Sequence, residues 1–187
     1  LDLYLIISRA LELISRNVGV SRGSIMLRDT ERGDLIVRAV LYDHADVRPA
    51  HIPLTFESGD GLAGWVIQHQ EPANIPDVLQ DARWVQVPGR ADQVRSVAAV
   101  PLKTSDIALG VLVLSSPEEG YFTDSQMNLL GTIASVVAAA VSNAQLYSYI
   151  NDLASNNAAL LAEQREETSK SAAVFRSVTE GVIVLDT

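Results

Sequence analysis

Apolar residues recur at helical spacing at the start of the chain. Leu3, Ile7, Leu11 and Ile14 follow one another at intervals of three or four residues, and Gly19 then provides a stop signal. The pattern predicts an amphipathic helix that ends before Gly19, with one face against the rest of the protein.

Apolar runs bounded by turn residues then predict two β-hairpins. The first has a strand around Ile25, a turn at Arg32–Asp34 and a returning strand at Leu35–Leu41. The second pairs Arg95–Lys103 with Ile107–Ser116 across the short link "TSD". Both strands of this second hairpin are apolar on both faces, which is typical of central strands covered on two sides.

The pattern is weaker between the hairpins. Residues 43–58 form a polar loop, Gly59–His69 carries apolar residues at helical spacing, and "ANIPDV" at Ala73–Val78 indicates a short strand or extended piece. Residues 77–94 are expected to form a loop with one helical turn around Ala82–Val85.

A long helix is expected after the second hairpin. Thr123 or Asp124 would cap it, and no Gly or Pro occurs from Thr132 to Glu180. Steps of four and three residues then build a heptad, in the order Leu146, Ile150, Leu153, Asn157, Leu160 and Gln164. Because a lone Asn at an a position favours parallel, in-register dimers, the pattern predicts a parallel homodimer through a coiled coil. The alternative is a single helix lying on its own domain.

The last residues change character. A short helix is expected before Gly181, and Val182–Asp186 then reads as a strand. Because a single strand has no partner, we expect it to be the first edge of a further domain. The chain, which begins at Leu1 and ends at Thr187, is therefore expected to be a piece of a longer protein.

Composition narrows the classes of function. The net charge of −9 disfavours phosphate backbones, so no nucleic-acid partner is expected. No run reaches the roughly 18 apolar residues of a membrane helix, so no membrane segment is expected in this chain. The absence of cysteine excludes disulfides and thiolate metal sites and is compatible with a cytoplasmic location, which we expect.

The stretch "SGDGLAGWV" contains three glycines, Gly59, Gly61 and Gly64, in the pattern G-x-G-x-x-G. A dinucleotide-binding turn with this pattern needs a strand before it and a buried parallel strand after its helix. The flanking segments contain prolines and supply neither strand. We therefore expect the glycines to permit a tight turn into a short helix and its close approach to a neighbour.

Six segments, taken in order, resemble the GAF domain family over about Leu3–Tyr149. They are "GSIMLRD", "GDGLAGWV", "IPDV", "VRSVAAVPL", "GVLVLSS" and "FTDSQMNLLGTIASVVAAAVSNAQLY". The resemblance implies an α+β fold with a central antiparallel sheet of five or six strands. The N- and C-terminal helices would pack on one face, and short helices and loops would cover the other. It also implies dimerisation through the terminal helices. The domains would be a GAF-like sensory domain at 1–149, a coiled-coil linker at 150–172 and, at 173–187, a segment resembling the start of a PAS domain.

The resemblance also bears on cofactors. Members that bind cyclic nucleotides carry an Asn-Lys pair, a Phe and an Asp-Glu pair, and of the corresponding positions here only Phe122 matches, so cyclic-nucleotide binding is not expected. Covalent bilin attachment and the family's methionine-sulfoxide reductases need cysteine, so neither is expected. His44 and His51 are the loop histidines considered for haem, and they are more typical of solvated side chains. No catalytic constellation or metal site is expected.

A small-molecule pocket would lie on the sheet face opposite the terminal helices. Its candidate residues are Met26, Trp65, Ile75, Asp77, Trp84 and Val97. The alternative is that these side chains pack as core or lid, since small pockets are themselves lined mainly by apolar groups.

The resemblance implies a regulatory, sensory GAF module, of a kind typically fused to histidine kinases, nucleotide cyclases or transcription regulators, and we expect a signalling protein of the sensor histidine kinase and two-component type. It would transmit its signal through a dimeric helical linker and have no enzymatic activity of its own. The alternative is a ligand-free dimerisation and spacer domain. A roomy site beside the glycine-rich helix would favour the sensor, and a site filled by side chains would favour the spacer.

Overall fold

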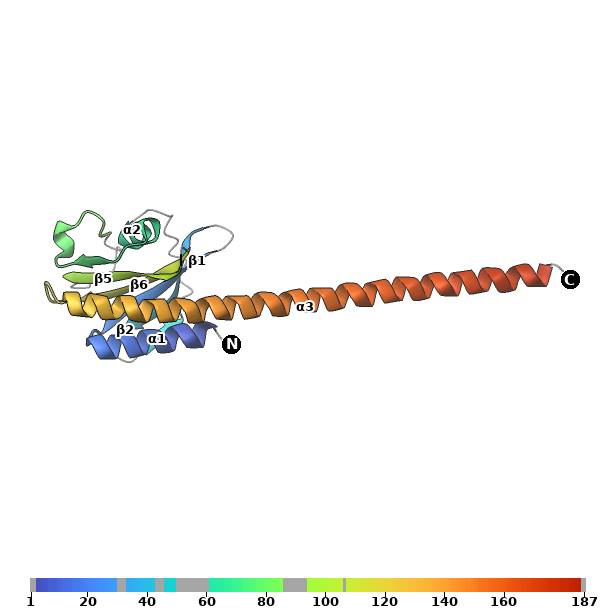
Figure 1. The fold of residues 1–187 in the computed structure, drawn as a ribbon, viewed down its shortest axis with the longest axis horizontal. Helices are drawn as coiled ribbons and strands as arrows, with labels where there is room; N and C mark the ends of the chain where they lie inside the picture. The colour runs from blue at the N-terminus through green and yellow to red at the C-terminus, as the bar shows by residue number, and fades with distance from the viewer. Residues whose placement is uncertain are drawn as a thin grey trace. The chain divides into compact units, whose positions relative to one another are not determined.

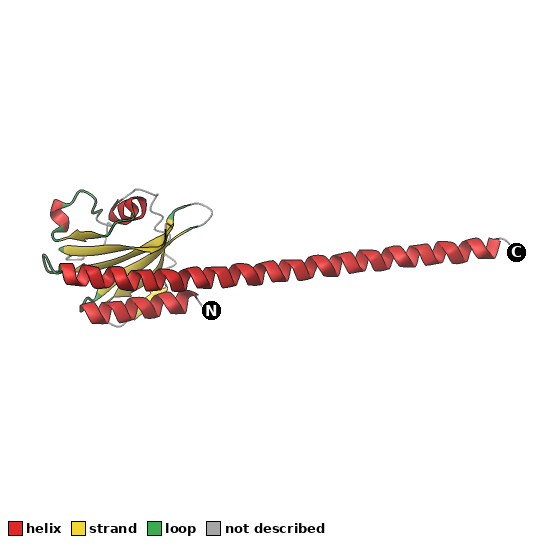
Figure 2. Ribbon diagram, in the orientation of Figure 1, coloured by secondary structure: helices red, strands yellow, loops and turns green. Residues whose placement is uncertain are grey.

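The computed structural model describes residues 3–29, 33–42, 46–49, 61–85, 94–105 and 107–185, with side chains left out at 46–49, 166–167, 169 and 171–185. Figure 2 shows the helices and strands along the chain. They are α1 (Leu3–Val18), β1 (Arg22–Arg28), β2 (Leu35–Tyr42), β3 (Asp46–Pro49), α2 (Gly61–His69), β4 (Ala73–Ile75), the 3₁₀ helix η1 (Val78–Gln80), β5 (Ser96–Thr104), β6 (Ile107–Ser116) and α3 (Asp124–Leu185).

The strands form one antiparallel sheet of six in the order β3-β2-β1-β6-β5-β4. Both predicted hairpins are present, as β1–β2 and β5–β6. The doubly apolar hairpin β5–β6 lies between β1 and β4, so both of its strands have neighbours on either side, as predicted. The predicted α+β fold with a central antiparallel sheet of five or six strands is confirmed.

Two apolar layers cover the sheet, one on each face. Figure 1 shows α1 and the first part of α3 on one face and α2 on the other. Strand β5 alternates between them: Ala98, Val100 and Leu102 join the core on the α1 and α3 side, whereas Val97 and Ala99 join the core on the α2 side. This alternation explains why the strand reads as a continuous apolar run.

Helix α3 begins with a reciprocal cap. The Thr123 hydroxyl accepts a hydrogen bond from the Gln126 amide at 3.3 Å, and the Gln126 side-chain oxygen accepts one from the Thr123 amide at 2.8 Å. This is the capping-box arrangement, which satisfies two backbone donors at a helix start. Thr123, one of the two caps that the sequence suggested, is therefore the N-cap.

Among the residues that the structure describes, one helix is long and apolar enough to cross a membrane by length and composition alone. It lies within Asp124–Arg165 of α3, where an 18-residue window has a mean hydropathy of 1.5 and is 33% buried inside the protein. The core accounts for part of this apolar character, because α3 buries a stripe of residues against the sheet. The stripe consists of Leu130, Ala134, Val137, Ala138, Val141 and Ala144. That the chain has no membrane segment stays a prediction.

The chain divides into two compact units, residues 1–145 and 146–187. Within the second unit, α3 continues to Leu185. The strand expected at Val182–Asp186 is therefore wrong over Val182–Leu185, and Asp186 lies outside the described residues. A helix satisfies its backbone hydrogen bonds internally, whereas a strand needs a neighbour. No strand of the described residues lies in this unit.

Two short elements differ from the sequence prediction. Strand β3 lies in the segment expected to be a loop and pairs with β2, from Ala39 opposite Pro49 to Tyr42 opposite Asp46. A single turn does lie at Ala82–Arg83, closed by the Trp84 amide, which donates to the Asp81 carbonyl at 3.1 Å, but the segment also forms a 3₁₀ helix earlier, at Val78–Gln80, that the sequence did not predict. Asp77 directs this placement, since its carboxylate accepts from the Leu79 amide at 3.1 Å and caps the helix.

Candidate functional site

The candidate site is the layer that covers the α2 face of the sheet. Helix α2 enters this layer at Gly61, whose φ is +66°. A Cβ at this residue would lie 3.6 Å from the Arg83 carbonyl oxygen, so the helix start packs closely on the η1–β5 connection. A positive φ favours glycine, which confirms the structural interpretation of the motif at this position. Gly64 is buried within α2, and Gly59 lies outside the described residues.

Five of the six candidate pocket residues meet in one apolar cluster. Met26, Ile75 and Val97 are buried members of it, and Trp65 and Trp84 are partly buried and pack against it. Side chains of α2, including Leu62, Val66 and Ile67, are buried in the same cluster. The structure thus brings these candidates together from β1, α2, β4, β5 and the segment after η1.

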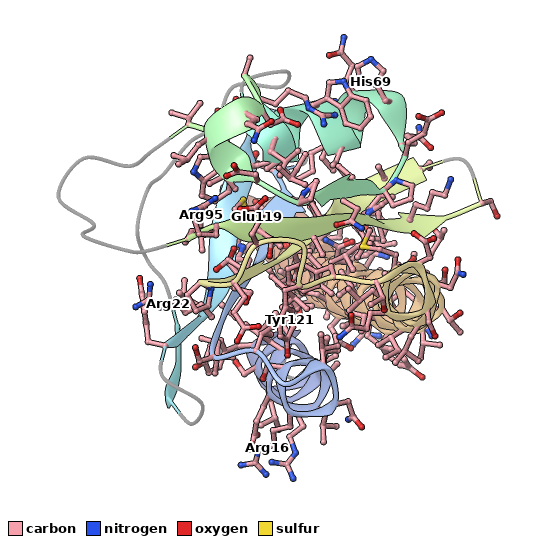
Figure 3. The ribbon with its side chains drawn as sticks, turned by 90° about the vertical axis from the view of Figure 1, so that its left-hand side faces the viewer. Arg16, Arg22, His69, Arg95, Glu119 and Tyr121 are labelled. Carbon is pink, nitrogen blue, oxygen red and sulfur yellow. The ribbon has the colours of Figure 1, made fainter. Side chains whose placement is uncertain are left out.

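Trp65 sits in a stack of polar groups at the surface of this layer. The His69 ring stacks on the indole with centroids 4.4 Å apart, and the Arg83 guanidinium carbon lies 4.4 Å from the indole centroid. Arg83 also pairs with Asp81 at 2.7 Å. This hydrogen-bonded pairing holds the pKa of the Asp81 carboxyl below its ordinary value. Trp65 therefore presents an apolar body to the core and meets a cation at the surface. Figure 3 labels His69 on α2.

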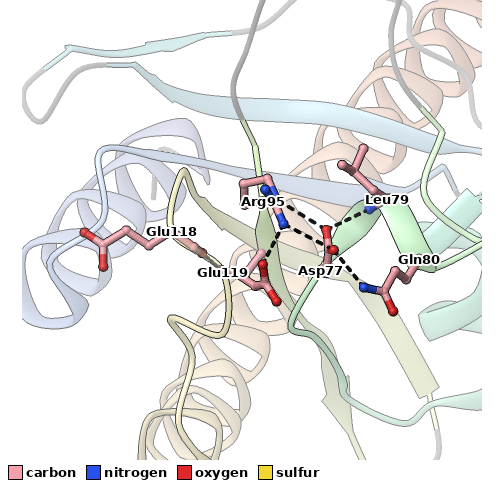
Figure 4. Close-up of polar contacts among 7 residues, drawn as sticks. Asp77, Leu79, Gln80, Arg95, Glu118 and Glu119 are labelled. Carbon is pink, nitrogen blue, oxygen red and sulfur yellow. Dashed lines mark hydrogen bonds and ion pairs between the residues drawn. The ribbon is translucent and has the colours of Figure 1, made fainter.

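Asp77, the sixth candidate, lies in a polar cluster next to the apolar one. Only 9% of the residue is exposed. Its carboxylate accepts hydrogen bonds from the Leu79 amide, from the Gln80 side chain at 3.0 Å and from Arg95 at 3.3 Å (Figure 4). The Leu79 amide bond, followed by those from Gln80 and Arg95, holds the pKa of the Asp77 carboxyl below its ordinary value. Asp77 is thus a fully engaged anion.

Sequence reasoning missed Arg95, which connects this cluster to the far end of β6. Its guanidinium lies 3.3 Å from Asp77 and 2.6 Å from Glu119. The three residues come from separate stretches of the chain, so no local spacing signals their contact. The only sequence signal is the charge at the start of an otherwise apolar strand.

This layer presents apolar surface next to paired charges. The described residues contain no group of three His, Cys, Asp or Glu side chains placed to hold a metal ion. The cluster offers apolar surface from the sheet and α2, a cation over an indole, and carboxylates that are already paired. His44 and His51 lie outside the described residues.

The candidate linker residues lie in the second unit. Leu146, Ile150, Leu153 and Leu160 are each about half exposed or more, and Asn157 is exposed as well. A row of large apolar side chains in water is unfavourable by about 25 cal/mol for each Å² left uncovered. Within this unit, α3 therefore presents an apolar stripe in the predicted heptad register.

Known proteins resemble this chain in sequence and in structure. A sequence model described as GAF domain matches residues 1–142. The chain is 29% identical over 157 residues to the formate hydrogenlyase transcriptional activator FhlA of Escherichia coli, an alignment that covers 82% of this chain and 22% of that protein. The chain thus spans about a fifth of the length of the curated relatives it matches.

Solved structures share the fold. The GAF domain of an Acinetobacter phosphoenolpyruvate-protein phosphotransferase is 19% identical with a TM-score of 0.68, covering 78% of this chain and 86% of that one. A free methionine-R-sulfoxide reductase from Neisseria meningitidis is 16% identical with a TM-score of 0.64, covering 78% and 81%. With the family match over residues 1–142 and this sheet between its two helical layers, the chain belongs to the GAF domain family of regulatory and sensory modules.

Proposed function

We propose that this GAF domain is the sensory module of a larger signalling protein, and that two copies pair in parallel through α3. The state of the domain would then be passed along the paired helices. We also propose that the chain has no catalytic activity of its own and works in the cytoplasm. It contains no cysteine, on which the family's reductases depend.

The observation that carries this proposal is the match between the linker heptad and the exposed face of α3 within the domain. Counting back in sevens from Ile150 and Leu146 gives the a and d positions of residues 129–143. These positions are Leu129, Thr132, Val136, Ala139 and Asn143. All five are exposed, and Val136 exposes 66% of its area. The heptad predicted for the linker therefore extends along the sequence into the domain without an insertion or deletion.

The buried stripe of α3 occupies the other heptad positions. Leu130, Val137 and Ala144 are b positions, Ala138 is a c position, and Ala134 and Val141 are f positions. Positions b, c and f lie on the side of a coiled-coil helix away from the a and d seam. One face of α3 thus packs on its own sheet and leaves the opposite face free for a second copy. This arrangement favours the dimer over a single helix lying on its own domain.

Sedimentation of the whole chain tests the dimer. We expect a dimer at micromolar concentration, and a monomer when a seam residue is replaced by a charge, as in Val136→Glu or Ile150→Glu. Ser155→Glu is the matched control, because it adds the same charge at an f position of the same exposed helix. A strict monomer of the unaltered chain at high micromolar concentration would contradict the proposal.

The spacer alternative has an observation of its own. Leu62, Val66 and Ile67 of α2 are buried against Ile75 and Val97, so side chains of the protein occupy the region expected to hold a ligand. Native mass spectrometry of the chain purified from cells separates the two functions. A retained small molecule supports the sensor, and a mass equal to that of the bare polypeptide supports the spacer.

The output domain is the other open part of the proposal. The sequence suggests a sensor histidine kinase with a PAS-like domain after the linker, and FhlA, to which the chain is similar, is a transcriptional activator. The coding sequence that flanks this chain distinguishes them. A phosphoacceptor histidine with an ATPase region would support the kinase, and a DNA-binding helix-turn-helix would support the activator.

A further inference from the structure

The segment Pro117–Thr123, which joins β6 to α3, receives contacts from the α2 layer. The Gly120 amide donates to the Pro76 carbonyl at 2.9 Å. The Asn74 side-chain amide donates to the Phe122 carbonyl at 2.9 Å, across 48 residues of sequence. Both partners belong to β4 or to the turn after it. The strand that carries Ile75 into the apolar cluster is thus bonded directly to the chain that leads into α3.

Two ion pairs of Arg95 join the same parts of the protein as these hydrogen bonds. Arg95 lies between Asp77, which follows β4, and Glu119, which belongs to the joining segment (Figure 4). The backbone of Arg95 is also engaged: its amide donates to the Ser116 carbonyl and its carbonyl accepts from the Val78 amide. Arg95 therefore holds η1, the end of β6 and the joining segment together through both its main chain and its side chain.

The same segment is tied to the opposite layer by Tyr121. Its hydroxyl donates to the Val18 carbonyl at 2.8 Å, at the C-terminal end of α1. The neighbouring Phe122 is buried in the α1 and α3 core, with its ring edge-on to Tyr121 at 5.3 Å. Figure 3 shows Tyr121 toward α1, and Glu119 with Arg95 nearer to α2. Both layers therefore contact the joining segment, which immediately precedes α3.

We infer that Asp77, Arg95 and Glu119 form a latch that couples the α2 layer to the first turns of α3, with Arg95 as its positioning residue. A displacement of β4 or η1 moves Asp77, and the guanidinium carries that displacement to Glu119. Glu119 lies five residues before the first residue of α3, Asp124. This inference rests on the proposed sensory function, for which it names the route of transmission. Hydrogen-bond and salt-bridge networks are one physical means by which such coupling is carried, and these residues form one.

Hydrogen exchange followed by mass spectrometry of the whole chain tests the latch. In Arg95→Gln and Glu119→Gln we expect amide exchange to rise about five-fold in the peptide that covers residues 124–131, the scale set by an ion pair of about 1 kcal/mol. Glu119 is 60% exposed on the side chain, so its replacement leaves the core intact. Arg83→Gln is the matched control, since it removes an ion pair of the same layer whose partner, Asp81, lies two residues away.

The outcomes are distinct. Faster exchange at the start of α3 in both latch variants, with the Arg83→Gln protein unchanged there, supports the latch. Unchanged exchange at residues 124–131, or an equal increase over the whole domain, overturns it, because either result reduces Arg95 to a structural role. Sedimentation of the unaltered chain is measured alongside. A monomer would contradict the proposed dimer, and the exchange comparison would still decide the latch.

Discussion

Gly110 of β6 lies where the neighbouring strand β1 leaves no room for a side chain. A Cβ on this residue would collide with the Met26 carbonyl oxygen and would lie 2.8 Å from Leu27 Cδ2 and 3.1 Å from Leu27 Cα. Gly110 is paired with Leu27 on one side and with Leu102 of β5 on the other. Because strands on both sides hold it, β6 cannot shift to make room. We predict that Gly110→Ala is strongly destabilising.

The size of the effect follows from what the new methyl group meets. Added carbon in a packed core costs about 1–3 kcal/mol, and the upper part of that range applies when the obstacle is backbone. Replacing glycine also lowers the conformational entropy of the unfolded chain, which offsets about 0.4–1 kcal/mol of this loss in stability. We therefore expect a net loss of about 1–2.5 kcal/mol, a substantial share of the 5–15 kcal/mol that stabilises a typical domain.

Urea unfolding monitored by tryptophan fluorescence measures this loss, at one fixed protein concentration because a dimer's stability depends on it. The control is Gly131→Ala, on the exposed face of α3, where a Cβ meets nothing within 4 Å. Alanine is favoured over glycine inside a helix by about 1 kcal/mol, so this variant should be more stable. A Gly110→Ala protein with an unchanged midpoint would refute the argument from close approach.

Two further predictions concern the polar cluster and the seam. Asp77→Asn should lower stability at pH 7, and its difference from the unaltered protein should vanish in acid-titration unfolding as the pH falls below 3.8. The reason is that the hydrogen bonds that depress the pKa of the Asp77 carboxyl stabilise the fold only while that carboxyl is ionised; a difference that does not shrink as the pH is lowered from 7 would contradict this. Asn157→Ile should raise the thermal midpoint of the dimer and admit higher oligomers in sedimentation, because Asn at an a position specifies the dimer at a cost in stability; a monomer would contradict it.

The sequence predicted the fold where a burial pattern extends over a whole element. Arg95–Lys103 and Ile107–Ser116 are continuous apolar runs because both of their faces are buried, and the helix after Thr123 shows an apolar stripe because one of its faces is. Strand β3 is too short to show such a pattern, since "DVRP" has four residues, two of them charged and one a proline, and it forms a strand by pairing with β2. Its existence depends on a neighbour that no local window contains.

The sequence predicted where the candidate site lies but not which of its residues contact one another. Asp77 was a candidate because its segment lies over the open face, but its partner Arg95 is 18 residues away and that residue's second partner, Glu119, is 24 further on. The exposed a and d positions of α3 within the domain could be identified only from the structure, which shows which side of α3 packs on the sheet.

Disulfide trapping tests the parallel seam most directly, because the chain contains no cysteine of its own. A d position brings its counterpart in the second copy within the Cα separation of about 4.4–6.8 Å that a disulfide requires. We predict that Ala139→Cys, in the domain, and Leu153→Cys, in the linker, each give a disulfide-linked dimer under mild oxidation, whereas Ser155→Cys at an f position stays monomeric on a non-reducing gel. Trapping of Leu153→Cys alone would contradict a seam that reaches the domain, and trapping of neither would contradict the parallel dimer itself.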